Sequence, residues 1–112
     1  MSAIDPEVAG QLAGELPREV FVAIVRSFEK DLARLVRQMV DAARAGNVEE
    51  YRGAAHALAG AAGSIGAKAL EALARQAMRS DDRTPAQQMI LGIGQEAKAA
   101  LAELAVLASE PG

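Results

Sequence analysis

The fold class of this chain is decided by residues 21–40, which read Phe21-Val-Ala-Ile-Val-Arg-Ser-Phe-Glu-Lys-Asp-Leu-Ala-Arg-Leu-Val-Arg-Gln-Met-Val40. Apolar residues recur three or four positions apart, which places them on one face of an α-helix. Charged residues fall mostly between them. The pattern predicts a helix that opens at Pro17, ends near Ala45 and is about 40 Å long at ~1.5 Å per residue.

The segment before this helix predicts a second, shorter one. Asp5 can act as the N-cap and Pro6 can occupy the first helical position, so a short helix should run to about Leu12. Its apolar face is thin, with Val8 and Leu12 as the larger members. We therefore expect it to lie across the end of a helical bundle.

Glycines and capping residues divide the following segment into two helices. Gly46 can take the left-handed conformation that ends a helix, and Asn47 can cap the next one. The next helix should then run from about Val48 to Ser64. Gly66 breaks the pattern, and a further helix is expected from Ala67 to Arg79.

A polar loop at residues 80–83 precedes the last helix. Thr84, Pro85 and Gln87 form a capping signal, and the helix should reach about Ala108. No segment alternates with the period of a β-strand. The sequence predicts an all-α fold, namely an antiparallel up-down four-helix bundle with a short N-terminal helix, and residues 1–112 as a single domain.

Composition excludes several classes of function. Only three residues are aromatic and the net charge is −3, so the basic stripe with stacking aromatics that nucleic acids require is absent. The chain contains no cysteine, which excludes disulfides and thiolate metal sites. It also shows no signal peptide and no apolar run of the ~20 residues needed to cross a bilayer. We expect a cytoplasmic protein without membrane contact.

The single histidine, His56, is predicted to face solvent. Tyr51, Leu58 and Ile65 recur every seven residues and form the expected core seam of their helix. His56 precedes Leu58 by two residues, so it lies about 200° around the axis. Its neighbours on that face are small or cationic, and they are Arg52, Gly53, Ala59, Gly60 and Gly63.

Two interpretations of this face are open. His56 is either an ordinary surface histidine or a reactive group that a partner approaches. Gly53, Gly60 and Gly63 each cost about 0.8–1 kcal/mol of helix stability relative to alanine, which favours close approach by something. Tight packing of a neighbouring helix, above all at Gly63, is the competing explanation.

The sequence offers few residues for a metal site or for catalysis by a Ser–His–Asp arrangement. One histidine with scattered carboxylates is a weak zinc or iron site, so we expect no metal and no cofactor. No nucleophile-elbow motif supports a Ser–His–Asp arrangement. A lone exposed imidazole can instead be a nitrogen nucleophile that accepts a group and passes it on.

The chain resembles the histidine-containing phosphotransfer (HPt) domain family. The family pattern, His-x-Leu-Lys-Gly followed by small residues and an apolar-Gly pair, is matched at His56, Leu58, Gly60, Ala61, Ala62, Ile65, Gly66, Ala67, Leu70 and Leu73. The resemblance covers nearly the whole chain.

The resemblance implies a phosphorelay intermediate of two-component signalling. His56 would accept a phosphoryl group through Nε2 from a receiver-domain aspartate and pass it to another receiver. Such a domain is a carrier without a kinase or ATP site, and the receiver supplies Mg²⁺. A hybrid histidine kinase is a further candidate partner. The small residues Gly53, Ala59, Gly60 and Gly63 would make room for the docked receiver.

One position departs from the family pattern. The family's lysine, three residues after the histidine, is Ala59 here. Arg52 is the candidate substitute that would offset phosphoryl charge, and Lys68 is a weaker one. Arg52 could equally be an ordinary solvated charge paired with Glu49.

Three functions therefore remain in competition. The first is phosphotransfer through His56. The second is a non-catalytic receiver-binding or scaffold module, in which the missing lysine marks weakened transfer. The third is a helical interaction protein whose motif match is coincidental. We expect a monomer, although a dimer through the long helix is an open alternative.

Overall fold

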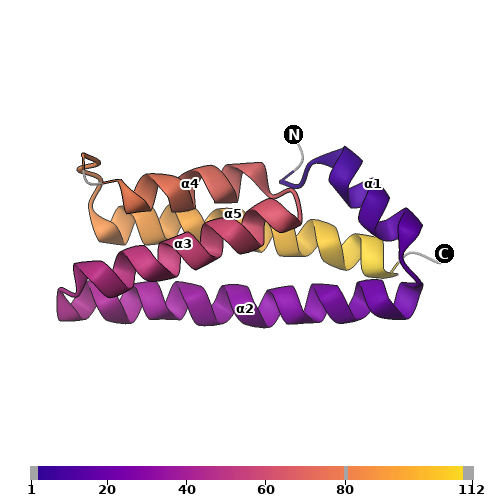
Figure 1. Ribbon diagram of the computed structural model, residues 1–112, viewed down its shortest axis with the longest axis horizontal. Coiled ribbons are helices and arrows are strands. Elements are labelled where there is room, and N and C mark those ends of the chain that lie inside the picture. The colour runs from indigo at the N-terminus through magenta and orange to yellow at the C-terminus, as the bar shows by residue number, and fades with distance from the viewer. Residues whose placement is uncertain (1–2, 80, 110–112) are drawn as a thin grey trace.

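The computed structural model describes residues 3–79 and 81–109, which form five helices. They are α1 (Pro6–Glu15), α2 (Arg18–Ala45), α3 (Val48–Ser64), α4 (Lys68–Met78) and α5 (Ala86–Ser109). Helices α2 to α5 run alternately up and down beside one another, and α1 lies across one end (Figure 1). The described part of the chain contains no strand. The predicted all-α bundle with a short N-terminal helix is confirmed.

Most of the predicted helix boundaries agree with the structure to within two residues. The exception is α1, which continues to Glu15 instead of ending near Leu12. The extra turn is explained by Leu12 and Leu16, which pack against the core as the chain leaves α1. In the predicted polar loop, Asp81 pairs with Arg79 at 2.9 Å, whereas Ser80 lies outside the described residues.

The long helix α2 buries one seam of side chains along its whole length. The buried residues alternate in steps of four and three, and they are Phe21, Val25, Phe28, Leu32, Leu35, Met39 and Ala42. Steps of four and three average 3.5 residues, so the seam stays on the side that faces the other helices. Val36 and Val40, which belong to the same predicted face, are only half-buried at its edge.

Small residues fill much of the remaining core. Helices α3, α4 and α5 contribute many alanines to it, namely Ala54, Ala55, Ala59, Ala62, Ala74, Ala77, Ala97 and Ala100. Alanine side chains let helix axes approach closely. No polar or charged side chain is buried among the residues described here, so the core depends on apolar packing. None of the described helices combines the length and apolarity that a membrane span requires.

The turn between α2 and α3 has the predicted chemistry. Gly46 adopts a φ of 70°, in the left-handed region, and its N–H reaches back to the carbonyl groups of Ala42 and Ala43. The Asn47 side chain accepts a hydrogen bond of 3.1 Å from the Glu50 N–H. These two residues end one helix and start the next within a single turn.

At the opposite end, the N-terminal segment closes the bundle over the turn between α3 and α4. Ile4 is buried, a contact that the sequence did not reveal. The Asp5 N–H donates to the Gly66 carbonyl at 2.8 Å, and the Asp5 carboxylate pairs with Lys68 at 2.8 Å. This hydrogen-bonded pair lowers the pKa of Asp5 and raises that of Lys68.

Gly66 is required by two features of this turn. Its φ is +77°, which L-amino acids with a side chain adopt only with strain. A Cβ atom there would also lie 2.8 Å from the Val8 Cβ atom, too close for any real contact. Gly66, which the sequence suggested as a helix break, therefore also leaves the space in which Val8 of α1 packs.

We predict that Gly66→Ala destabilises the protein by at least about 1–2 kcal/mol, because it forces a strained backbone and displaces Val8. Urea denaturation followed by circular dichroism measures the change. Gly94→Ala in α5 is the matched control, since a Cβ atom there would meet nothing within 4 Å. Equal stability of the two variants would contradict this account of Gly66.

Candidate functional site

His56 projects from the exposed side of α3, as predicted. Leu58 and Ile65 are buried on the opposite side. The imidazole has no hydrogen-bond or ion-pair partner within the described ranges, and both ring nitrogens are open to an approaching molecule. We use "His56 face" for the exposed surface of α3 formed by Arg52, Gly53, His56 and Gly60.

Gly53 and Gly60 stand in open space one turn before and one turn after His56. A Cβ atom added at either position would meet nothing within 4 Å. Packing inside this chain therefore gives no reason for glycine at these two positions. Both leave the backbone around His56 uncovered, which is the arrangement that close approach by a partner requires.

Gly63 has a different explanation. A Cβ atom there would lie 3.2 Å from an oxygen of the Glu71 carboxylate, which reaches over from α4. Glu71 also accepts two hydrogen bonds from Arg75, at 3.1 and 2.7 Å. Contact with a side chain of α4 therefore distinguishes Gly63 from Gly53 and Gly60, although Gly63 itself is exposed.

The prediction that Ala59 lines the exposed face is wrong. Ala59 is only 3% exposed and belongs to the core cluster. Three residues rotate the helix by about 300°, which falls 60° short of His56, and Gly63 shows that α4 packs on that side. A lysine at position 59 would thus have to emerge from a packed boundary instead of extending along a free surface.

Arg52 is exposed and, across residues 3–79 and 81–109, its guanidinium has no carboxylate partner. The suggested pairing with Glu49 does not occur. Three of the cations that follow α3 are paired, Lys68 with Asp5, Arg75 with Glu71 and Arg79 with Asp81. Arg52, one turn before His56, is a cation whose charge remains available.

Lys68 lies away from His56. It is the first residue of α4, beyond the turn that ends α3. Ser64, the last residue of α3, is already eight residues or about 12 Å along the helix from His56. The ion pair with Asp5 gives Lys68 a structural role at the α1 end of the bundle.

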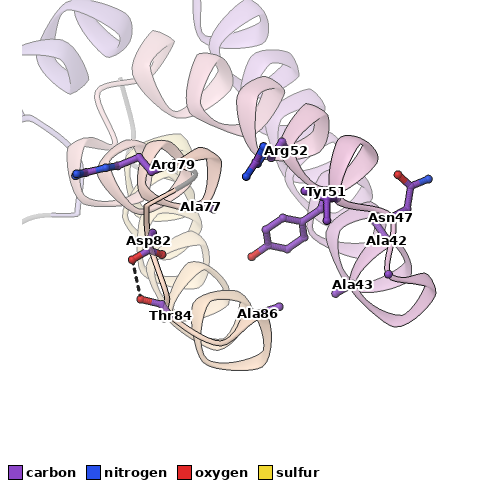
Figure 2. Close-up of a pocket in the computed structure, with 12 residues that line it drawn as sticks. Ala42, Ala43, Asn47, Tyr51, Arg52, Ala77, Arg79, Asp82, Thr84 and Ala86 are labelled. Carbon is purple, nitrogen blue, oxygen red and sulfur yellow. Dashed lines mark hydrogen bonds between the residues drawn. The ribbon is translucent and has the colours of Figure 1, made fainter.

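Tyr51 is not a core residue of the predicted seam. It is half-buried, and its ring lines a cleft of about 280 Å³ between α3 and the connection from α4 to α5 (Figure 2). Burial and the nearby negative charge of Asp82 raise the pKa of its hydroxyl. No local signal in the sequence reveals the cleft, because its lining comes from separate segments and combines Asp82 and Thr84 with alanines at positions 42, 43, 77 and 86.

The imidazole of His56 is the group of the His56 face that can act as a nucleophile. An accessible imidazole nitrogen can attack an electrophile that a partner brings, and a cation one turn away can offset negative charge. Among the described residues, no three His, Cys, Asp or Glu side chains gather into a group that could hold a metal ion.

Comparison with known proteins gives one match. The family model of the Hpt domain matches residues 23–106, which is three quarters of the chain. No curated protein and no solved structure is detectably similar to the chain. The matched segment contains all of α3 and α4, and therefore the whole His56 face.

We predict that Gly53→Ala and Gly60→Ala each stabilise the fold by about 0.5–1 kcal/mol, because alanine is the better helix former and has free space at both sites. Thermal and urea denaturation measure this gain. A loss of stability in either variant would mean that the fold itself requires these glycines.

Proposed function

This chain belongs to the Hpt domain family, and we propose from that membership that it is a phosphorelay intermediate that carries the phosphoryl group on His56. Hpt domains perform histidine phosphotransfer in two-component signalling and interact with the receiver domains of response regulators. The assignment to His56 rests on its exposure on a helix face where Gly53 and Gly60 leave the backbone uncovered. It is also the only histidine of the chain.

The proposed step is an in-line displacement at phosphorus. The Nε2 lone pair of neutral His56 attacks the phosphoryl group of a receiver phosphoaspartate. A P–N bond forms as the P–O bond to the aspartate breaks, and the aspartate leaves as a carboxylate. Nδ1 keeps its proton throughout. The reverse sequence passes the phosphoryl group to a second receiver, and in both directions Mg²⁺ belongs to the receiver.

Arg52 is the proposed residue that screens the transferred charge. It lies one turn before His56 on the same face and has no competing carboxylate among the described residues. Helical side chains lean toward the N-terminus of their helix, so the imidazole extends toward Arg52 and away from Gly60. Gly53 and Gly60 complete the proposed docking surface, and Ala59, being buried, is left out of it.

We predict that phosphorylated receiver domains encoded in the same genome transfer one phosphoryl group to this protein. Intact-mass measurement at neutral pH should show an acid-labile adduct, and His56→Gln should abolish it. Receiver binding without an adduct would favour the scaffold alternative. Neither binding nor adduct with any of these receivers would contradict the proposed function.

For Arg52→Ala we predict phosphotransfer about tenfold slower, because one charge-assisted contact worth about 1.4 kcal/mol is lost in the transition state. Rapid-quench kinetics with a single receiver measure the rate. Arg52→Lys should recover most of it, since the charge is kept. Arg26→Ala, which removes an exposed arginine of α2, is the matched control. A wild-type rate in Arg52→Ala would show that Arg52 is only a solvated charge.

A further inference from the structure

The surface on the two sides of His56 along α3 differs in what is available to a partner. Toward the C-terminal end of α3, Gly60 and Gly63 are exposed, and the Glu71 carboxylate, held by Arg75, lies beside Gly63. Toward the N-terminal end, Arg52 is followed by the cleft and by Val48. The N-terminal direction therefore leads from His56 to a cleft, whereas the C-terminal direction leads to a carboxylate that is already paired.

The cleft on that side is formed by segments from four places in the chain. They are the turn between α2 and α3, the first turns of α3, the end of α4 with the following loop, and the start of α5. Figure 2 shows Tyr51 and Arg52 directed from α3 toward the loop that holds Asp82 and Thr84. Alanines account for much of the remaining lining.

The charged side chains of the cleft differ in whether they have a hydrogen-bond or ion-pair partner. Asp82 accepts hydrogen bonds from Thr84 at 3.0 Å and from Gln76 at 3.2 Å, and Arg79 pairs with Asp81. The guanidinium of Arg52 has no partner among the described residues, so the cation at the inner edge of the cleft is unneutralised. Arg52 precedes His56 by one helical turn.

The outer edge of the cleft is apolar and exposed. Val48 lines it and is 57% exposed, one of the few large apolar side chains of the bundle that face solvent. Glu49 and Glu50 follow Val48 in the first turn of α3, and Asp82 lies across the cleft. These three carboxylates disfavour an acidic group in the cleft, and the alanine lining favours an uncharged apolar one.

We infer that the receiver docks off-centre, from His56 toward the N-terminal end of α3, and places an apolar side chain in the cleft against Tyr51 and Val48. The inference rests on the proposed function. Its argument is charge complementarity, since Arg52, one helical turn before His56, is a cation at the edge of the cleft without an ion-pair partner among the described residues and can meet the anion delivered to His56. Val48 precedes His56 by eight residues, so the two contact points on the receiver are about 12 Å apart.

The single tyrosine of the chain reports on this cleft directly. With Tyr51 replaced by 3-fluorotyrosine, the protein has one ¹⁹F resonance. Titration with a receiver that passes the transfer test should shift this resonance, with a midpoint equal to the Kd measured independently by calorimetry. A receiver that binds and leaves the resonance unmoved overturns the inference and leaves the proposed function intact.

A pair of matched valine variants gives a second test. Val48→Ser should weaken the binding of the same receiver at least about fivefold, because it removes apolar contact at the cleft edge. Val106→Ser, at a residue of α5 that is 58% exposed, should leave the Kd unchanged. Equal affinities of the two variants overturn the inference. Failure of every receiver to bind or transfer overturns the proposed function, and this inference with it.

Discussion

Close packing of α3 between α2 and α4 is the constraint on which the rest of the structure depends. Helix α3 contacts both neighbours, and it does so through alanines, chiefly Ala54, Ala55, Ala59 and Ala62. Side chains of this size bring the helix axes together, and a larger residue at any of these positions would force them apart. Because α3 is covered on two sides, only its remaining sector is exposed, and His56 lies in it.

Ion pairs distribute the charge of α3 and α4 unequally. Helix α4 lies so close to α3 that the Glu71 carboxylate rests against Gly63, and from there it binds Arg75. Lys68 pairs with Asp5 and Arg79 with Asp81, whereas none of the described carboxylates pairs with Arg52 of α3. Arg52 therefore offers an incoming anion a positive charge one helical turn from His56.

The helices and the orientation of His56 could be predicted because they depend on periodicity and on local caps. Gly46 and Asn47 act within one turn, and the relation of His56 to Leu58 is fixed by helix geometry alone. The burial of Ala59 could not be predicted, since a residue at the edge of a helical face is buried or exposed according to where the neighbouring helix lies. The cleft beside Tyr51 was equally hidden, because four separate segments form it. The contact of Val8 with Gly66 is a third feature that depends on segments far apart in the sequence.

The arrangement of the two bundle ends has a practical consequence for attachment. Ala3 and Ser109 both lie at the end that α1 closes, where the Ala3 N–H donates to Glu103 and Arg18 donates to the Ala108 carbonyl. The cleft lies at the opposite end, where α2 turns into α3 (Figure 1). A tether, a sensor surface or a fused partner joined at either terminus would therefore be held roughly a helix length away from it. The molecule can be immobilised in one orientation with its proposed docking surface pointing outward.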